Sequence, residues 1–92
     1  MRVRWLLRSV HDLESIVDFI AKDSPAAALT EMERILAAVG QLGAFPASGR
    51  PGRVPDTREL VVSSYIVAYR VQHGAVQVLR VLHAARKWPE TL

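Results

Sequence analysis

The 92-residue sequence predicts an α+β fold in which two helices pack on one face of a small sheet. Alternating apolar residues at the N-terminus indicate a strand, two segments of helical periodicity follow, and three runs rich in β-branched residues come last. Because the chain is shorter than most domains and 50% of its residues are hydrophobic, we expect a single domain, 1–92, with one core.

The N-terminal segment predicts a strand followed directly by a helix. Apolar residues alternate with arginines, the period of two of a half-buried strand, at Val3, Trp5 and Leu7. Helical spacing then runs from about Val10 to Ala21, and Ser9 with Asp12 resembles a capping box. The apolar stripe of this helix includes Phe19, which we expect in the core.

A second helix follows after a very short connection. Ser24 can cap its first amides, and Pro25 suits the first helical position, where a missing N–H costs nothing. One apolar stripe that includes Met32 continues to Leu42, and Gly43 is a suitable C-terminal cap. The tight connection predicts that the two helices form an antiparallel hairpin.

The remaining chain predicts a loop and then a sheet. Residues 45–55 contain three prolines and two glycines, which excludes a helix interior or a central strand and indicates a loop that carries Arg50 and Arg53. Three β-rich runs follow, separated by short turns, and predict a three-stranded antiparallel meander: 58–62, 65–71 and 75–83. The last residues, 84–92, predict a surface tail.

Charge is segregated along the chain. Residues 9–33 carry six acidic and one basic side chain, whereas residues 34–92 carry eight basic and three acidic ones. Ten of the twelve cations are arginines, whose planar guanidinium binds phosphate or carboxylate through two points. The distribution therefore favours an anionic macromolecular partner over an ordinary solvated surface.

Composition also excludes several classes of protein and site. The absence of cysteine excludes disulfides, thiolate metal sites and a cysteine nucleophile, and it fits a reducing cytoplasm. We expect no secretion signal and no transmembrane segment, because charges or glycines interrupt every apolar run. His11, His73 and His83 lack metal-ligand spacing and no glycine-rich phosphate loop occurs, so we expect no metal and no cofactor.

Segments spread over almost the whole chain together resemble the RelE/ParE superfamily of bacterial toxins. They are Asp12–Ala21, the second helix with Phe45-Pro46, Gly49–Gly52, Arg58–Leu60, Tyr65–Val71 and Val78–His83. The resemblance implies a growth-arresting toxin that a cognate antitoxin neutralises by wrapping around it. We expect the antitoxin to cover the apolar sheet surface or the outer side of the helical hairpin, in a hetero-oligomer.

The two branches of this superfamily imply different targets. RelE-like members cleave messenger RNA on the ribosome, whereas ParE-like members poison DNA gyrase without hydrolysing a substrate. The arginine that RelE-like nucleases carry on the middle strand is replaced here by Ile66, within Tyr65–Tyr69. The sequence resembles the ParE branch in Tyr69-Arg70-Val71 and Arg80–His83, so a gyrase poison is favoured; a ribosome-dependent endoribonuclease, or a non-toxic protein that only binds antitoxin, is the alternative.

The candidate site residues divide by these alternatives. As a nuclease the chain would use His83, Arg80 and Arg86, with His83 as the general acid or base. Two of them have a structural alternative: His83 as a strand-end residue, and Arg80 as a buried cation paired with Glu59.

As a binding protein the chain would use its other cations. The candidates for contacting a partner or a nucleic acid are Arg50, Arg53, Arg70, Lys87 and Trp88. Arg70 should face outward from its strand, where a solvated charge is the ordinary interpretation, and Trp88 can equally close an edge of the core.

Overall fold

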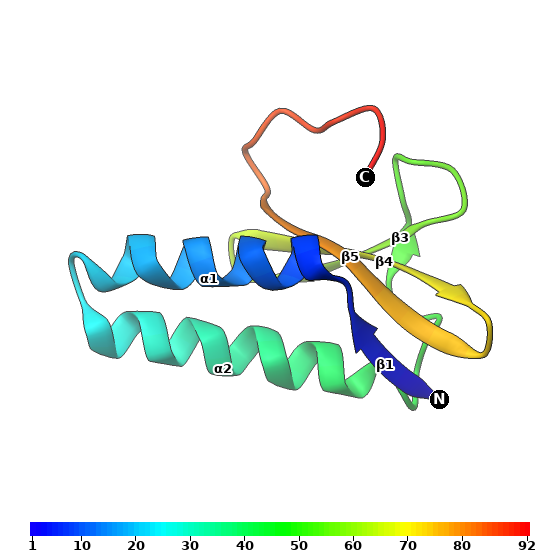
Figure 1. The fold of residues 1–92 in the computed structure, drawn as a ribbon, viewed down its shortest axis with the longest axis horizontal. Coiled ribbons are helices and arrows are strands. Elements are labelled where there is room, and N and C mark those ends of the chain that lie inside the picture. The colour runs from blue at the N-terminus through cyan, green and yellow to red at the C-terminus, as the bar shows by residue number, and fades with distance from the viewer.

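The computed structural model describes residues 1–92 as a helical hairpin packed against a twisted sheet (Figure 1). The elements in chain order are β1 (Arg2–Trp5), α1 (Leu7–Ala21), α2 (Pro25–Gln41), β2 (Arg50–Pro51), β3 (Arg58–Val62), β4 (Tyr65–Gln72) and β5 (Ala75–His83). Neither helix is long and apolar enough to cross a bilayer.

The sheet is mixed, which corrects the sequence-based topology. Its order is β1-β5-β4-β3-β2: the predicted antiparallel meander of β3, β4 and β5 is present, but β1 pairs with β5 in parallel, from Arg2 opposite Ala75 to Trp5 opposite Val78. The helical hairpin explains this pairing, because it returns the chain to its start, where the Met1 amino group donates to the Gly43 carbonyl at 2.9 Å. The meander then runs beside β1.

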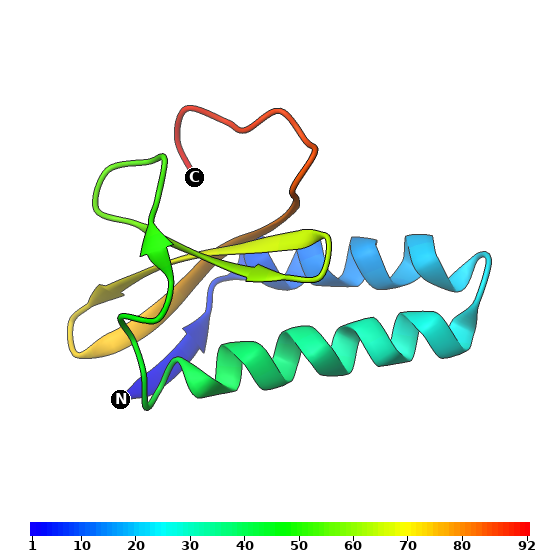
Figure 2. The same cartoon turned by 180° about the vertical axis from the view of Figure 1, so that it is seen from behind.

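The core lies between the helical hairpin and one face of the sheet. Its largest buried cluster joins α2 to the three long strands through Ile35, Val39, Val62, Val67, Val78 and Val81. A second cluster, Leu42, Tyr69 and Val76, continues the core toward the loop. Figure 2 shows the two helices lying side by side next to the sheet.

The N-terminal boundaries differ from the predicted ones. Leu7 lies in α1, not in the first strand, and is exposed. Ser9 is not a helix cap, because it lies inside α1 and its hydroxyl donates to the Leu6 carbonyl at 2.6 Å. The cap of α2 is as predicted: the Ser24 hydroxyl accepts the Ala27 N–H at 3.1 Å, with Pro25 in the first turn.

The helices leave several large apolar side chains in solvent. Phe19 is 69% exposed, so its predicted place in the core was wrong; Leu29 and Leu36 on α2 are also exposed. The wide apolar stripe of each helix exceeds what one face of a small sheet covers. A hollow of about 440 Å³ between the helices, the helix groove, is lined mainly by Val10, Leu13, Val17, Met32 and Leu36. Exposed apolar surface of this kind indicates an interaction site.

Candidate functional site

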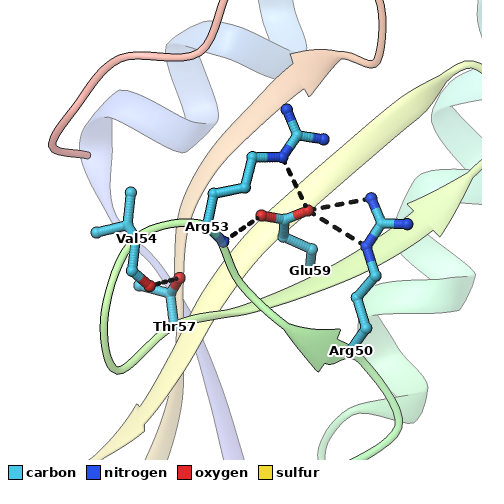
Figure 3. A network of polar contacts seen from close by, with 5 residues as sticks. All are labelled: Arg50, Arg53, Val54, Thr57 and Glu59. Atoms are coloured by element: carbon cyan, nitrogen blue, oxygen red, sulfur yellow. Dashed lines mark hydrogen bonds and ion pairs between the residues drawn. The ribbon is translucent and has the colours of Figure 1, made fainter.

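A buried carboxylate organises the basic half of the protein (Figure 3). Glu59 on β3 is 2% exposed, and its Oε1 accepts from Arg50 Nε at 3.3 Å and Nη2 at 3.1 Å. Its Oε2 accepts the Arg53 backbone N–H at 2.8 Å, and the Arg53 Nε lies 3.5 Å from Oε1. Glu59 thus holds two guanidinium groups whose outer atoms remain in solvent, since these side chains are 54% and 46% exposed.

The chain from Arg50 to Thr57 is an ordered loop. Arg50 and Pro51 form β2, a short strand that pairs with β3 and that the proline content did not predict. The Thr57 hydroxyl donates to the Val54 carbonyl at 2.7 Å, and the Gly52 N–H donates to the Thr57 carbonyl at 2.8 Å. These bonds fix the positions of the loop arginines.

Tyr69 anchors the segment that leads into this loop. The Tyr69 side chain is fully buried; its hydroxyl donates to the Pro46 carbonyl and accepts the Gly49 N–H, both at 2.8 Å. A Cβ on Gly49 would lie 2.6 Å from that hydroxyl, so glycine is required for the close approach. Arg58 adds a further tie, because its Nη1 donates to the Gly49 carbonyl at 2.7 Å.

Arg70 does not stand free on its strand. Its Nε donates to the Gln77 side-chain oxygen at 2.8 Å, and its side chain is half-buried. Arg70 and Arg58 line the same hollow of about 370 Å³, with Asp56 and Thr57 on its wall. We call the two arginines held by Glu59, together with Arg58 and Arg70, the basic site: Arg50, Arg53, Arg58 and Arg70.

The C-terminal tail lies beside the basic site. Both ribbon views show it arching toward the 50–57 loop (Figures 1 and 2). The Arg53 guanidinium carbon lies 4.3 Å from the centre of the Trp88 ring, a cation–π contact. Arg86 and Lys87 are exposed on the same tail, so it adds two cations near the basic site.

The basic site therefore retains positive charge despite its ion pairs. Its four guanidinium groups are opposed locally by Glu59 and by Asp56. Both loop arginines share the one carboxylate of Glu59 and still present N–H groups to solvent. An arrangement of several half-exposed guanidinium groups can bind an anionic surface, such as a phosphate backbone or a protein carboxylate cluster.

Arg80 is paired as expected but with another residue than predicted. Its Nε and Nη2 donate to the Asp12 carboxylate at 2.7 and 3.1 Å, so the predicted pairing with Glu59 was wrong. The physical reason is distance across the sheet: Glu59 and Arg80 both lie opposite Ala68, but β4 separates their strands, whereas Asp12 of α1 lies at the free edge of β5. A register shift between β4 and β5 also places Val78 opposite Tyr69 and Arg80 opposite Ala68. Strict alternation would place Arg80 on the same face of the sheet as Val78, but the register shift places it on the opposite face.

Asp12 also closes the edge of the sheet. Because β1 ends opposite Val78, β5 continues without a neighbouring strand, and Asp12 accepts the Val81 N–H at 3.0 Å. The hydrogen bond with Asp12 raises the pKa of Arg80 above its ordinary value, although burial opposes this. Arg80 is 6% exposed and donates to Asp12 through both Nε and Nη2, so the geometry makes it part of a structural ion pair.

His83 lies at the end of β5 with its proton placement fixed by a backbone bond. Its Nδ1 accepts the Ala85 N–H at 3.0 Å, which assigns the ring proton to Nε2 in the neutral state. Its ring packs edge to face with Tyr65, with centres 5.4 Å apart. His83 in this tautomer can donate a hydrogen bond but must lose the Ala85 bond to accept a proton.

The three candidate nuclease residues do not form one constellation. Arg80 faces Asp12, His83 contacts Tyr65 and Ala85, and Arg86 lies in the exposed tail. Three roles were not predicted from the sequence: the pairing of Asp12 with Arg80, the contacts of Glu59 with the loop arginines, and the bond of Arg58 with Gly49. No local signal marks Asp12 as a sheet-edge partner, because it lies 68 residues from Arg80 in the chain.

The family is shown by comparison with known proteins. A family model described as the ParE toxin of the type II toxin-antitoxin system parDE matches residues 3–88. This chain belongs to the ParE toxin family. The toxin is similar to "Putative toxin Y4kP" of Sinorhizobium fredii, 46% identical over 99% of this chain and 96% of that protein. It is also similar to Toxin RelE2 of Caulobacter vibrioides, 35% identical over 92% and 97%.

Solved structures extend the comparison to the fold. The chromosomal ParDE toxin-antitoxin system of P. aeruginosa contains a chain that is 28% identical, with a TM-score of 0.80 over 90% of the toxin and 95% of that chain. The RelBE2 toxin-antitoxin complex of Mycobacterium tuberculosis contains one that is 29% identical, with a TM-score of 0.60 over 89% and 95%. The resemblance to the RelE/ParE superfamily is confirmed: the protein is the toxin of a type II toxin-antitoxin system.

Proposed function

We propose that the toxin arrests growth by poisoning DNA gyrase in the cytoplasm through the basic site and the adjoining tail. The observation that carries the proposal is the exposed guanidinium surface that remains around Glu59, fixed in place by the ordered loop. Such a surface suits an enzyme that holds DNA, because the target presents phosphate or acidic side chains. Lys87 and Trp88 extend the same surface.

The environment of the nuclease candidates supports a binding poison over a ribonuclease. Cleavage at a 2′-hydroxyl needs a base, an acid and a cation within reach of one phosphate. Arg80 is occupied by Asp12, and Ile66, which replaces the family arginine, is buried opposite Leu82. The higher TM-score of the ParDE system also favours the ParE branch.

A ribosome-dependent endoribonuclease is the second candidate function. The similarity to Toxin RelE2 favours it, and so does the backbone bond that keeps Arg86 near His83, from the Arg86 N–H to the His83 carbonyl at 3.0 Å. In that case His83 would need to open its bond with Ala85 to take a proton. The toxin would then cleave messenger RNA in a translating extract.

An antitoxin is the second partner, and the helix groove supports a place for it. The groove is apolar on its floor and carries Glu14 and Asp18 among its lining residues. An amphipathic antitoxin helix that brings apolar side chains flanked by cations would fit this surface. Antitoxin and gyrase would thus use different sides of the toxin. The acidic helices would face the antitoxin, and the basic site would face gyrase.

A supercoiling assay with matched variants tests the proposed function. Purified toxin should inhibit gyrase, and Arg53→Gln should weaken inhibition because it removes one exposed cation while Arg50 continues to neutralise Glu59. Lys22→Gln also removes an exposed cation, between the two helices of the hairpin, and should have no effect. Inhibition that is absent, or equal in both variants, contradicts the proposal; cleavage of messenger RNA in an extract supports the second candidate.

A further inference from the structure

A further hollow, of about 530 Å³, shares no lining residue with the helix groove or the basic site. It forms where the first half of α2 meets the turn between β3 and β4 and the end of β5. Glu31 and Arg34 line it from α2, Ser63 lines it from the turn, and Tyr65 and His83 line it from the strands. We call it the Glu31 pocket.

Glu31 is an acidic side chain buried in the wall of this pocket. The residue is 8% exposed, and its Oε2 accepts from the Ser63 hydroxyl at 3.2 Å. Its Oε1 is buried and no donor of the chain reaches it. Buried carboxylate oxygens are almost always hydrogen-bonded, because leaving one unpaired is costly. Glu31 Oε1 therefore has capacity for a donor that comes from another molecule.

The charge around Glu31 favours a cationic donor. Arg34 lies 3.7 Å from Oε2, without a hydrogen bond to either oxygen, and its side chain is 62% exposed and free to turn outward. The other ionisable groups of the pocket are Tyr65 and His83. Burial, and to a lesser extent Glu31, raises the pKa of Tyr65, so this phenol stays neutral beside the carboxylate.

The aromatic wall favours a planar cation. The rings of Tyr65 and His83 meet at 83° with centres 5.4 Å apart, so they form a corner beside the carboxylate. A guanidinium group can stack on such a ring while its N–H groups donate to a carboxylate. A compact, strongly hydrated ammonium group uses this geometry less well.

We propose that the Glu31 pocket binds an arginine side chain of the cognate antitoxin. The guanidinium donates to Glu31 Oε1, lies against Tyr65 and displaces Arg34 toward solvent. The inference rests on the proposed antitoxin partner and adds a polar anchor to the apolar contact at the helix groove. An anchor of this kind sets the register of the bound segment. In any other register the arginine would lose its hydration without forming the ion pair with Glu31.

Methylguanidinium chloride is a probe that does not require the antitoxin. In the labelled wild-type toxin it should shift the carboxyl resonance of Glu31 and the ring resonances of Tyr65 saturably, whereas tetramethylammonium chloride should not. Glu31→Gln should weaken binding about tenfold, the value of one charge-assisted hydrogen bond. Glu33→Gln, an exposed acid two residues away, is the matched control and should bind like wild type.

Two results overturn the inference. One is the absence of a saturable resonance shift in the wild type, which would mean that only water binds Glu31 Oε1. The other is equal binding of methylguanidinium by Glu31→Gln and Glu33→Gln. If Glu31→Gln fails to fold, Ala27→Leu provides a second test, because this exposed helical residue lines the pocket and a larger side chain narrows it. This variant must bind methylguanidinium more weakly than wild type. Unchanged binding by this folded variant would equally refute the pocket.

The cognate antitoxin itself separates this inference from the proposed function. Wild-type toxin should bind it, Glu31→Gln should bind about tenfold more weakly, and one antitoxin arginine replaced by glutamine should show no further loss in the Glu31→Gln background. An antitoxin that fails to bind wild-type toxin contradicts the proposed partner. Tight binding with Glu31→Gln equal to Glu33→Gln contradicts the arginine anchor alone.

Discussion

Single carboxylates decide which arginines of this toxin are available to a partner. Asp12 binds the guanidinium of Arg80 and the N–H of Val81, so it neutralises a buried cation and closes a strand edge at once. Glu59 likewise binds the side chain of Arg50 and the N–H of Arg53. The difference lies in exposure: Arg80 is buried, whereas the loop arginines keep about half of their side chains in solvent.

Removing Asp12 should strongly destabilise the toxin. Asp12→Ala leaves Arg80 buried without a counter-charge and the Val81 N–H without an acceptor, so we expect a loss of about 3–5 kcal/mol. Chemical denaturation measures this free energy of unfolding. Asp18→Ala, an exposed acid on the same helix, should change stability by about 0.5 kcal/mol or less. Equal effects of the two variants would contradict the structural role of the ion pair.

The raised pKa of Tyr65 predicts a loss of stability at alkaline pH. Burial first, and Glu31 second, favours the neutral phenol in the folded state. The unfolded phenol ionises at about pH 10, so the stabilisation is complete below that pH and falls as the pH rises toward the folded pKa. Tyr65→Phe should lose this decline, measured by denaturation at pH 9 to 11; an unchanged decline would contradict the assignment.

Which residues the sequence could predict depends on whether their partners are near in the chain. The Ser24 cap with Pro25 is local and was predicted correctly. The burial of Arg80 in an ion pair follows from its place in an apolar strand, but its partner depends on where α1 packs along the edge of β5, which no local signal marks. Phe19 fits the helical stripe and is nevertheless exposed, because periodicity gives a face without saying what covers it.

At the scale of elements, the connections carry the less predictable features. The meander of β3, β4 and β5 follows from turn residues, and His73 with Gly74 adopts the left-handed backbone that a two-residue hairpin turn requires. The parallel pairing of β1 depends on how the helical hairpin returns the chain, and the short β2 depends on the contacts of Glu59. Neither cause can be found in the local sequence pattern. The sequence therefore predicted a loop here, but not the short strand β2 within it.

Replacing Glu59 should loosen this loop selectively. Glu59→Gln removes the charge that holds Arg50 and Arg53, and we expect a loss of about 1–3 kcal/mol, as for a buried hydrogen-bonded group. Amide hydrogen exchange should accelerate from Arg50 to Thr57 and stay unchanged in α2. Uniform acceleration across the molecule would instead mean that Glu59 supports the whole fold and not this loop.

The whole molecule is polarised between an apolar, acidic helical side and a basic sheet edge. The helix groove and the Glu31 pocket involve the hairpin, whereas the basic site and the tail lie at the β2 edge and beyond. The segregation of charge along the sequence predicted this division, since acids concentrate in the helices and cations in the sheet half. It did not predict which cations stay exposed, because that depends on tertiary ion pairs.

The most direct test of the central claim is gyrase supercoiling measured with purified toxin over a range of salt concentrations. The account predicts inhibition that weakens as salt rises, because exposed guanidinium groups make the contact. It also predicts that Arg53→Gln shifts the inhibition curve to higher toxin concentration while Lys22→Gln does not. Full gyrase activity at a large excess of folded toxin would contradict the claim.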